Sequence, residues 1–301
     1  MNVPFIPFAE GEALLDWVGL TDALAAGHQL PKAEIGDTFL YRDPDTLLSR
    51  AAWIDGMGMA VKTATIFPEN ADAPAINGGV SLYSDADGTL EAIIDFHLVT
   101  KWKTAADSLL AARRLAPPDA RRILIVGAGT VAGSVREAFG AGFPGAAFSL
   151  WNRTNSRATA LQKIWPDLTI APDLEAAVRA ADIIVGCTMA AQPWLQGAWL
   201  RPGQHINLIG AYRPDMREAD DAALLRSRVF VDSFDTTLGH IGEIRIPLEA
   251  GTISRDHLLA DYYDLAAFNP APEDTTLFKN GGGAHLDLMT SRYILDRWRA
   301  Q

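Results

Sequence analysis

The spacing of apolar residues changes along the chain at about residue 117. Beyond this point, short apolar runs alternate with segments of helical length. The expected strands are RILIVGA, AAFSLWN, DLTIA, DIIVGCT, HINLIGA and RVFVDS, and the expected helices between them include residues 130–140, 156–164 and 173–181. Strands that are apolar on both faces are typical of a parallel sheet covered by helices on both sides. Residues 118–283 are therefore predicted to form an α/β domain with a doubly wound parallel sheet.

The first part of the chain has shorter, strand-like patterns. They occur in TLLSRAAWI, GMAVKTATIF and GGVSLYSDADGTLEAIIDF, and Asp87-Gly88 in the last of these is typical of a hairpin turn. Residues 98–115 are rich in Ala and Leu and contain neither Gly nor Pro, so we expect a helix there. Pro117-Pro118 ends this helix, and we place a domain boundary at this point.

A last helix is expected over residues 284–301, where Leu286, Met289 and Tyr293 fall on one face. The pattern does not decide against which domain this helix packs. The three glycines before it, residues 281–283, permit either a close approach of the backbone to a ligand or a flexible joint.

The composition excludes several functional classes. The chain has 301 residues, of which 49% are hydrophobic, and 37 acidic against 26 basic residues give a net charge of -11. So acidic a chain is not expected to bind nucleic acid or an anionic membrane. No apolar run reaches about 18 residues, and residues 1–20 lack a basic segment followed by an apolar one. We therefore expect a cytoplasmic protein without a membrane span.

Neither a disulfide nor a metal site is expected. Cys187 is the single cysteine, which excludes an internal disulfide and a metal site built from several cysteines. The six histidines show no spacing typical of metal ligands, so we predict no metal. No G-x-S-x-G motif is present, so nucleophilic hydrolysis has no support.

A glycine-rich loop follows the first strand of the second domain. The strand ILIV runs into GAGTVA, residues 127–132, and then into an expected helix. Gly127 permits a tight turn, Gly129 lets the backbone approach a pyrophosphate, and Ala132 is small enough for the helix to pack on the strand. The amides at the start of the helix, at Thr130 and Val131, favour an anion together with the helix dipole. The motif predicts a Rossmann dinucleotide site rather than an ordinary glycine turn.

The next strand predicts which dinucleotide binds. It ends at Asn152, and Arg153 and Thr154 follow where NAD-binding proteins usually have an acidic residue. A guanidinium suits the 2′-phosphate of NADP, so NADPH is expected and NADH is less favoured. The alternative is an exposed arginine that caps the following helix. Cys187 and Thr188, at the end of DIIVGCT, are also predicted to contact the cofactor.

Three charged residues in apolar surroundings are candidates for the chemistry. Strand alternation puts Lys62 on a face of small apolar residues, where it either reaches solvent at a sheet edge or lies in a cavity with a lowered pKa. Lys103 and Thr104 lie near the start of a helix, beside alanines that leave space for a carboxylate ligand, although an exposed lysine is the common alternative. Asp287 is either a site carboxylate or a partner of the helix N-terminus.

The ordered set of segments resembles the ornithine cyclodeaminase/mu-crystallin family. The segments are VKTATIFPEN, LVTKWKTAADSLLAA, ILIVGAGTVA, WNRT, INLIGAYRPDMREAD, VFVDS and LFKNGGGAHLDL, which together span about residues 50–290. The resemblance implies a homodimer of two-domain chains. In each chain, residues 1–117 with 284–301 form an α+β domain that binds substrate and builds the dimer. The Rossmann domain, residues 118–283, holds NAD(H) or NADP(H).

The resemblance also implies roles for individual residues. Lys62 matches the family's active-site lysine, and Lys103 stands where the family usually has an arginine that grips the substrate carboxylate. The segment Asn152-Arg153-Thr154 matches the NADPH signature of the mu-crystallin branch. Lys32 and Arg50 are further candidates for binding the substrate carboxylate.

One residue separates this chain from the cyclodeaminases. These enzymes carry an acid-base aspartate in a loop that corresponds here to Gly210-Ala211-Tyr212, so Tyr212 takes its place. Asp215 aligns with a different position of the loop. Tyr212 is expected to line the substrate site, where it either blocks the pocket or donates a hydrogen bond. Without the aspartate, the amine-oxidising half of cyclodeamination lacks its acid-base partner.

The expected activity is therefore that of a reductase. NADPH would reduce a cyclic ketimine 2-carboxylate, 1-pyrroline-2-carboxylate or 1-piperideine-2-carboxylate, to the L-amino acid, with Lys62, Lys103 and Asp287 as catalytic residues. Three alternatives stay open. An ornithine cyclodeaminase would release ammonia from ornithine, an alanine-type dehydrogenase would form pyruvate from alanine with NAD, and a non-catalytic binding protein would hold NADPH without turnover.

Overall fold

The computed structural model describes residues 3–301 and divides the chain into two compact units. The first unit comprises the chain up to Ala106 together with Gly283–Gln301, and the second comprises Asp107–Gly282. Met1 and Asn2, which the sequence assigns to the first domain, lie outside the described residues.

The change of unit falls inside a helix, α3 (Phe96–Leu115), whereas the sequence pattern places it at residue 117. Two hydrogen bonds explain the difference. The Tyr262 hydroxyl donates to the carbonyl of Asp107 at 2.5 Å, and the Thr276 hydroxyl donates to that of Leu115 at 3.2 Å. These contacts tie the second half of α3 to the second unit.

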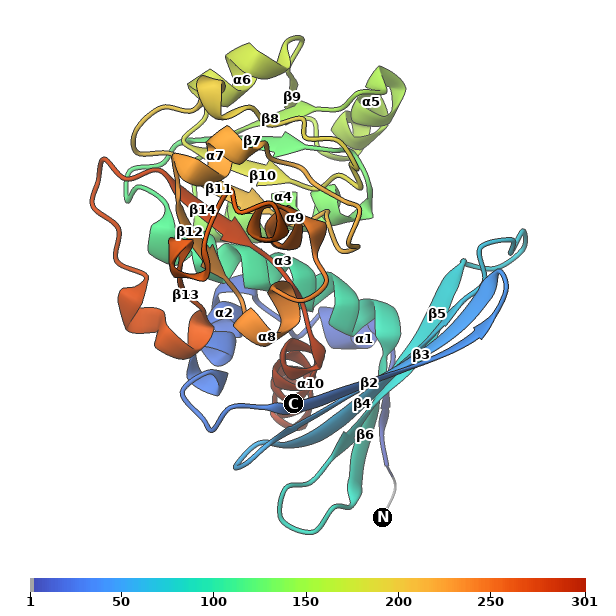
Figure 1. Cartoon of the computed structure of the whole chain (residues 1–301). Coiled ribbons are helices and arrows are strands. Elements are labelled where there is room, and N and C mark those ends of the chain that lie inside the picture. Colours follow the sequence, from blue (N-terminus) through green and yellow to red (C-terminus); the bar gives the residue numbers. More distant parts are fainter. Residues whose placement is uncertain (1–2) are drawn as a thin grey trace. The chain divides into compact units, whose positions relative to one another are not determined.

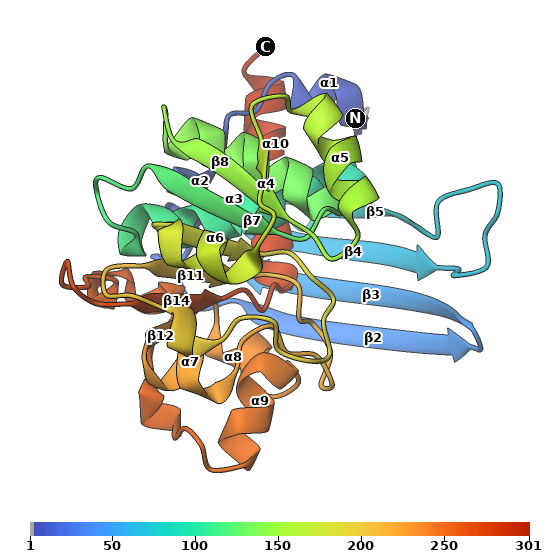
Figure 2. The ribbon, with the colours of Figure 1, turned by 90° about the horizontal axis from the view of Figure 1, so that it is seen from above.

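The first unit contains a six-stranded sheet in the order β1-β6-β5-β4-β3-β2. Its strands are β1 (Phe5–Ile6), β2 (Glu34–Arg42), β3 (Asp45–Ile54), β4 (Gly58–Ile66), β5 (Ile76–Tyr83) and β6 (Leu90–Asp95). Neighbours are antiparallel except for β1 and β6, which are parallel. Figures 1 and 2 show β2, β3 and β4 as long neighbouring strands. The predicted turn at Asp87-Gly88 is confirmed, because Gly88, with φ 72°, connects β5 to β6.

The helices of the first unit include the last one in the chain. They are α1 (Phe8–Glu12), α2 (Trp17–Gly27), α10 (Ala284–Arg299) and the first half of α3. Helix α10 contacts β3, β4 and α2, so the last helix packs within the first unit. Leu286 and Met289 are buried, whereas Tyr293 is partly exposed and its hydroxyl donates to Asp16 at 2.8 Å.

The second unit contains an eight-stranded sheet in the order β13-β12-β14-β11-β10-β7-β8-β9. Its strands are β7 (Arg122–Val126), β8 (Ala147–Trp151), β9 (Thr169–Ile170), β10 (Ile183–Gly186), β11 (His205–Leu208), β12 (Arg228–Val231), β13 (Leu258–Ala260) and β14 (Thr276–Lys279). Every pairing is parallel. The predicted α/β fold with a doubly wound parallel sheet is confirmed.

Both sides of this sheet are buried. Its helices are α4 (Thr130–Gly142), α5 (Asn155–Ile164), α6 (Leu174–Ala180), α7 (Asp221–Leu225), α8 (Phe234–Thr237) and α9 (Gly242–Glu249), with short 3-10 helices η1 (Gly197–Trp199), η2 (Arg255–His257) and η3 (Tyr262–Ala267). Leu124 and Ile184 pair in register and form one apolar cluster with Val178 of α6. The intervening residues Ile123 and Ile125 are equally buried, as expected for strands between two helical layers.

The strand order reverses at β7. The chain runs outward from β7 through β8 to β9 and then returns to β10 on the other side of β7. In open parallel sheets, ligands bind outside the carboxyl ends of the strands at such a point. Gly127 follows β7 and Cys187 follows β10, so the residues predicted to bind the cofactor gather at this edge.

Candidate functional site

A buried carboxylate in the first unit holds two lysines. Lys62 Nζ donates to Asp287 Oδ1 at 3.0 Å, and Lys103 Nζ lies 3.0 Å from the same oxygen. The exposed fractions are 1% for Asp287, 6% for Lys62 and 8% for Lys103. Lys62 Nζ also donates to Thr100 Oγ1 at 2.9 Å and lies 4.6 Å from the centre of the Phe96 ring. We call Lys62, Lys103 and Asp287 the lysine–aspartate cluster.

Three elements bring this cluster together. Lys62 lies on β4, between β3 and β5, and the alternation of that strand turns it to the buried face. It is therefore an interior lysine and does not reach solvent at a sheet edge. Lys103 lies on α3, and Asp287 lies in the first turn of α10. The exposed alternative for Lys103 is wrong, because Asp287 holds its ammonium inside the unit.

The cluster shifts two pKa values. Burial lowers the pKa of Lys62 to about 8, an effect that Asp287 opposes and Lys103 reinforces. Burial alone would raise the pKa of Asp287, but Lys103 and Lys62 outweigh it and bring this pKa to about 2. Asp287 is therefore ionised at neutral pH. Lys62 is protonated there and can release its proton at little cost, which suits an acid catalyst.

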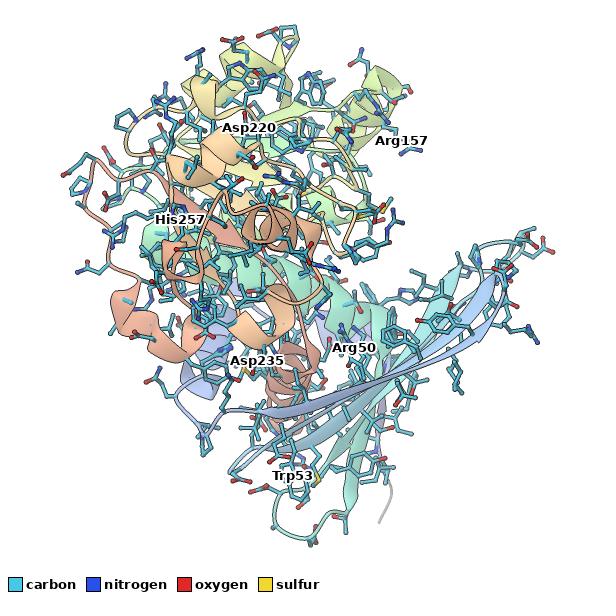
Figure 3. All side chains as sticks on the ribbon, in the orientation of Figure 1. Arg50, Trp53, Arg157, Asp220, Asp235 and His257 are labelled. Atoms are coloured by element: carbon cyan, nitrogen blue, oxygen red, sulfur yellow. The ribbon has the colours of Figure 1, made fainter. Side chains whose placement is uncertain are left out.

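Arg50 places a third cation beside the cluster. It lies on β3, directly opposite Lys62 in the strand register. Its guanidinium forms a fork with both carboxylate oxygens of Asp37 on β2, with a shortest distance of 2.6 Å. Figure 3 shows Arg50 and Trp53 on opposite sides of β3. Asp37 neutralises the charge of Arg50, whereas the single carboxylate of Asp287 faces two lysines. The site therefore carries excess positive charge, which favours an anionic ligand.

The second oxygen of Asp287, Oδ2, is buried and has no hydrogen-bond partner among residues 3–301. Oδ1, by contrast, contacts both lysines. A buried carboxylate oxygen without a donor is costly unless a ligand or water supplies one. Oδ2 can therefore accept a hydrogen bond from a ligand or from a water.

The remaining predicted substrate residues lie in different surroundings. Thr104 follows Lys103 on α3 and is partly buried, and Lys32 is exposed in the segment between α2 and β2. Tyr212 belongs to the second unit, in the loop after β11, where its side chain is 53% exposed. The structure thus gathers Arg50 with the lysine–aspartate cluster.

The glycine-rich loop of the second unit fits a pyrophosphate. Gly127 has φ 108°, and a Cβ at this position would lie 2.8 Å from the carbonyl oxygen of Cys187, so only glycine fits. A Cβ at Gly129 would meet no atom within 4 Å, which leaves open space beside the loop. Helix α4 begins at Thr130 without a side-chain cap, so the first amides, including that of Val131, are available to an anion.

The turn after β8 is fastened to this loop by Asn152. Its Oδ1 accepts from the amide of Ala128 at 3.2 Å, and its Nδ2 donates to the carbonyl of Thr154 at 2.7 Å. Arg153 is exposed on the turn. Thr154, not Arg153, occupies the N-cap of α5, which argues against the capping alternative for the arginine.

Sequence reasoning misses a group of buried charges in the second unit. Glu218, Glu243 and Lys279 are all 0% exposed. In the segment PDMREAD, Glu218 has acids and an arginine around it, as an exposed loop would. Of the three, only Lys279 has a sequence context that indicates burial, because it ends β14 directly after two apolar residues.

The described part of the chain holds no group of three or more His, Cys, Asp or Glu side chains that could bind a metal ion. None of its helices is both long and apolar enough to cross a bilayer. Burial and the neighbouring Glu218 raise the pKa of the Cys187 thiol well above its ordinary value, so this thiol stays protonated and is a poor nucleophile.

The chain is similar in sequence and in fold to known proteins. The sequence model of the ornithine cyclodeaminase/mu-crystallin family matches residues 53–301. The Delta(1)-pyrroline-2-carboxylate reductase of Paracoccus denitrificans is 48% identical over 301 residues, which cover 96% of this chain and 95% of that protein.

Two solved structures share the fold. One is the Thermococcus litoralis Delta(1)-pyrroline-2-carboxylate reductase in complex with NADH and L-proline, with a TM-score of 0.88 and 23% identity over 98% of this chain and 97% of that one. The other is an archaeal alanine dehydrogenase dimer with bound NAD, with a TM-score of 0.90 and 23% identity over 100% and 97%. With a family match over most of its length and a relative almost half identical to it, the chain belongs to the ornithine cyclodeaminase/mu-crystallin family.

Proposed function

We propose that this chain reduces 1-pyrroline-2-carboxylate to L-proline with a reduced nicotinamide cofactor. The observation that carries the proposal is the lysine–aspartate cluster, in which buried cations lie next to a buried carboxylate oxygen without a donor. A cyclic imine with a 2-carboxylate offers the matching groups, an anion and an imine nitrogen, on adjacent atoms. The Paracoccus denitrificans relative, which is 48% identical, is named for this reaction and supports the assignment.

Lys103 and Arg50 bind the substrate carboxylate. A lysine at position 103 donates as a point charge and lacks the planar fork of an arginine. The guanidinium of Arg50 supplies such a planar group beside the cluster. Asp37 orients it by accepting hydrogen bonds from Nε and Nη2. Nη1 then has hydrogens left for the ligand.

Reduction of a C=N bond needs a hydride at carbon and a proton at nitrogen. The reduced nicotinamide, when bound, supplies the hydride. Lys62 supplies the proton, since a pKa of about 8 leaves it charged at neutral pH yet ready to donate. Asp287 Oδ2 accepts the N–H so formed, and its negative charge stabilises the positive charge that develops on the C=N group. Lys62 then recovers its proton from solvent.

We infer that the cofactor is NADPH. Its pyrophosphate would be held by the loop at Gly127 and Gly129 and by the amides of Thr130 and Val131. Arg153 is exposed on the turn that Asn152 fastens to this loop, and no acidic residue stands at the end of β8. A guanidinium at this position pairs with a 2′-phosphate, which NADH lacks.

Replacing Arg153 with glutamate is expected to lower the preference for NADPH over NADH at least about tenfold, because the carboxylate repels the 2′-phosphate and accepts from a free 2′-hydroxyl. The preference is the ratio of kcat/KM values for the two cofactors. Lys163→Glu, an equal charge change at the exposed end of α5, is the matched control and leaves the ratio unchanged. An unchanged ratio in Arg153→Glu would show that Arg153 does not select the cofactor.

We further propose that the chain acts as a homodimer. The edge strand β2 exposes three large apolar side chains near its C-terminal end. The exposed fractions are 45% for Phe39, 60% for Leu40 and 75% for Tyr41. Apolar surface of this kind is typical of a face covered by another chain. The alanine dehydrogenase of the same fold was solved as a dimer.

The proposed function is tested by following NADPH oxidation with 1-pyrroline-2-carboxylate and 1-piperideine-2-carboxylate in separate reactions. Rapid oxidation with the five-membered ring is expected, and the ratio of the two rates gives the ring preference. Ornithine with NAD is assayed in parallel for ammonia, and alanine with NAD for pyruvate. Turnover of either amino acid without turnover of an imine would overturn the proposal, and tight NADPH binding without any turnover would favour a binding protein.

A further inference from the structure

Glu218 receives hydrogen bonds from two loops at once. Its Oε1 accepts from the amide of Thr188 at 2.9 Å and from the hydroxyl of the same residue at 2.7 Å. Its Oε2 accepts from the amide of Gly210 at 2.7 Å. Thr188 follows β10 and Gly210 follows β11, and these strands are neighbours in the sheet. One carboxylate therefore ties together the carboxyl ends of two adjacent strands.

The backbone around this carboxylate is packed without spare room. A Cβ on Gly210 would lie 1.8 Å from the carbonyl oxygen of Thr188, and one on Gly186 would lie 2.8 Å from Glu218 Oε1. The phosphate loop contacts the same segment, through Gly127 and the carbonyl of Cys187. A shift of Thr188 is thus transmitted to the backbone on both sides of it.

Glu218 is itself held from within the unit. Its amide donates to Glu243 Oε2 at 2.6 Å, and the amide of Ala219 donates to Glu243 Oε1 at 3.0 Å. Lys279 Nζ donates to the carbonyl of Leu208 at 3.0 Å, and its positive charge interacts favourably with both glutamates. Because Glu218 is 0% exposed, it acts on a ligand through Thr188 rather than by contact.

We propose that Glu218 is the positioning residue for the nicotinamide half of the cofactor. The inference rests on the proposed function, since it requires a nicotinamide dinucleotide. A dinucleotide on a doubly wound sheet crosses the reversal point of the strand order. If its 2′-phosphate end lies at Arg153, after β8, its other end falls beyond β7, at the ends of β10 and β11. Thr188 and Gly210, the two residues that Glu218 fixes, occupy those ends.

The test uses Glu218→Gln, which keeps the size of the side chain but turns one acceptor into a donor that faces N–H and O–H groups. NADPH and 2′-phospho-ADP-ribose, the same dinucleotide without nicotinamide, are titrated separately against the whole protein. The dissociation constant for NADPH is expected to rise about tenfold, and that for the fragment to stay within about twofold. A merely structural defect would weaken both ligands alike.

Glu249→Gln is the matched control, because Glu249 is exposed on α9 and pairs only with the surface residue Arg245 in the described contacts. Thr188→Val removes the hydroxyl, which donates to Glu218 and accepts from Trp194 Nε1 at 3.0 Å, and it decides the question if Glu218→Gln does not fold. The double variant is expected to bind NADPH no more weakly than the weaker single variant, because both changes disrupt the hydrogen bond from the Thr188 hydroxyl to Glu218. Equal weakening of both ligands, or no weakening of either, overturns the inference. A wild-type protein that fails to bind NADPH would instead overturn the proposed function, and this inference with it.

Discussion

Replacing Lys62 with methionine is expected to lower kcat about a thousandfold with 1-pyrroline-2-carboxylate, since proton transfer by a positioned group contributes roughly 10²- to 10⁴-fold. Methionine keeps the length and the apolar fit beside Phe96 but carries no proton for the imine nitrogen. KM is expected to change less, because Lys103 and Arg50 still bind the carboxylate. Steady-state kinetics of NADPH oxidation measure both constants.

Lys163→Met serves as the control, because Lys163 is exposed at the end of α5 and lies outside the cluster. It should leave both constants unchanged. Undiminished kcat in Lys62→Met would remove Lys62 from the mechanism, whichever cofactor is used.

The same lysine predicts how the wild-type activity depends on pH. Burial sets the pKa of Lys62 at about 8, so the acid form is present below that value and is lost as the pH rises through it. Because this is the pKa of the ligand-free chain, kcat/KM is expected to fall above about pH 8. Lys62→Arg, whose guanidinium does not titrate in this range, should retain some activity without this alkaline limb. An identical limb in both proteins would assign it to another group.

The second large effect concerns stability. Asp287→Asn is expected to lower the free energy of unfolding by about 3 kcal/mol, because two buried ammonium groups lose the carboxylate between them. Adding Lys103→Met should recover at least about 1 kcal/mol, since it removes one of the two unpaired cations. Urea unfolding of the three proteins at neutral pH measures these differences. A double variant less stable than Asp287→Asn would contradict the ionic account.

The sign of the pH effect follows from the depressed pKa of Asp287. This pKa is about 2 in the folded chain, against an ordinary 3.8, so the stabilisation is present above 3.8 and is lost as the pH falls through about 2. The shift is worth about 2 kcal/mol. Between pH 5 and 2 the wild type should lose about that much more stability than Asp287→Asn does. Equal losses would mean that folding does not lower the pKa of Asp287.

Much of the fold follows from the sequence, because local pattern and tertiary role agree there. The apolar strands β7, β10 and β11 are buried on both faces, and only a parallel sheet between helices offers such an environment. β2 was not predicted as a separate strand, because an edge strand exposed along its whole length lacks the alternation that marks β3 and β4. The division within α3 was also missed, since the side chains that capture its second half, Tyr262 and Thr276, lie far along the chain.

The candidate site was predictable in parts. Lys62 and Asp287 are polar residues in apolar segments, a conflict that marks functional positions. Their meeting at 3.0 Å, however, joins residues 225 positions apart, and no local pattern contains that contact. The burial of Glu218 was not predicted, because it depends on contacts with the loops after β10 and β11. The sequence neighbours of Glu218 are those of an exposed loop.

The central claim is hydride transfer to the carbon of a cyclic imine. It is tested most directly by incubating the protein with 1-pyrroline-2-carboxylate and NADPH deuterated at nicotinamide C4 on either face, and by analysing the product by mass spectrometry and chiral chromatography. L-proline with a single deuterium at C2, from one of the two labelled faces, is the predicted result. Proline without deuterium from either face, or no proline at all, would contradict the account.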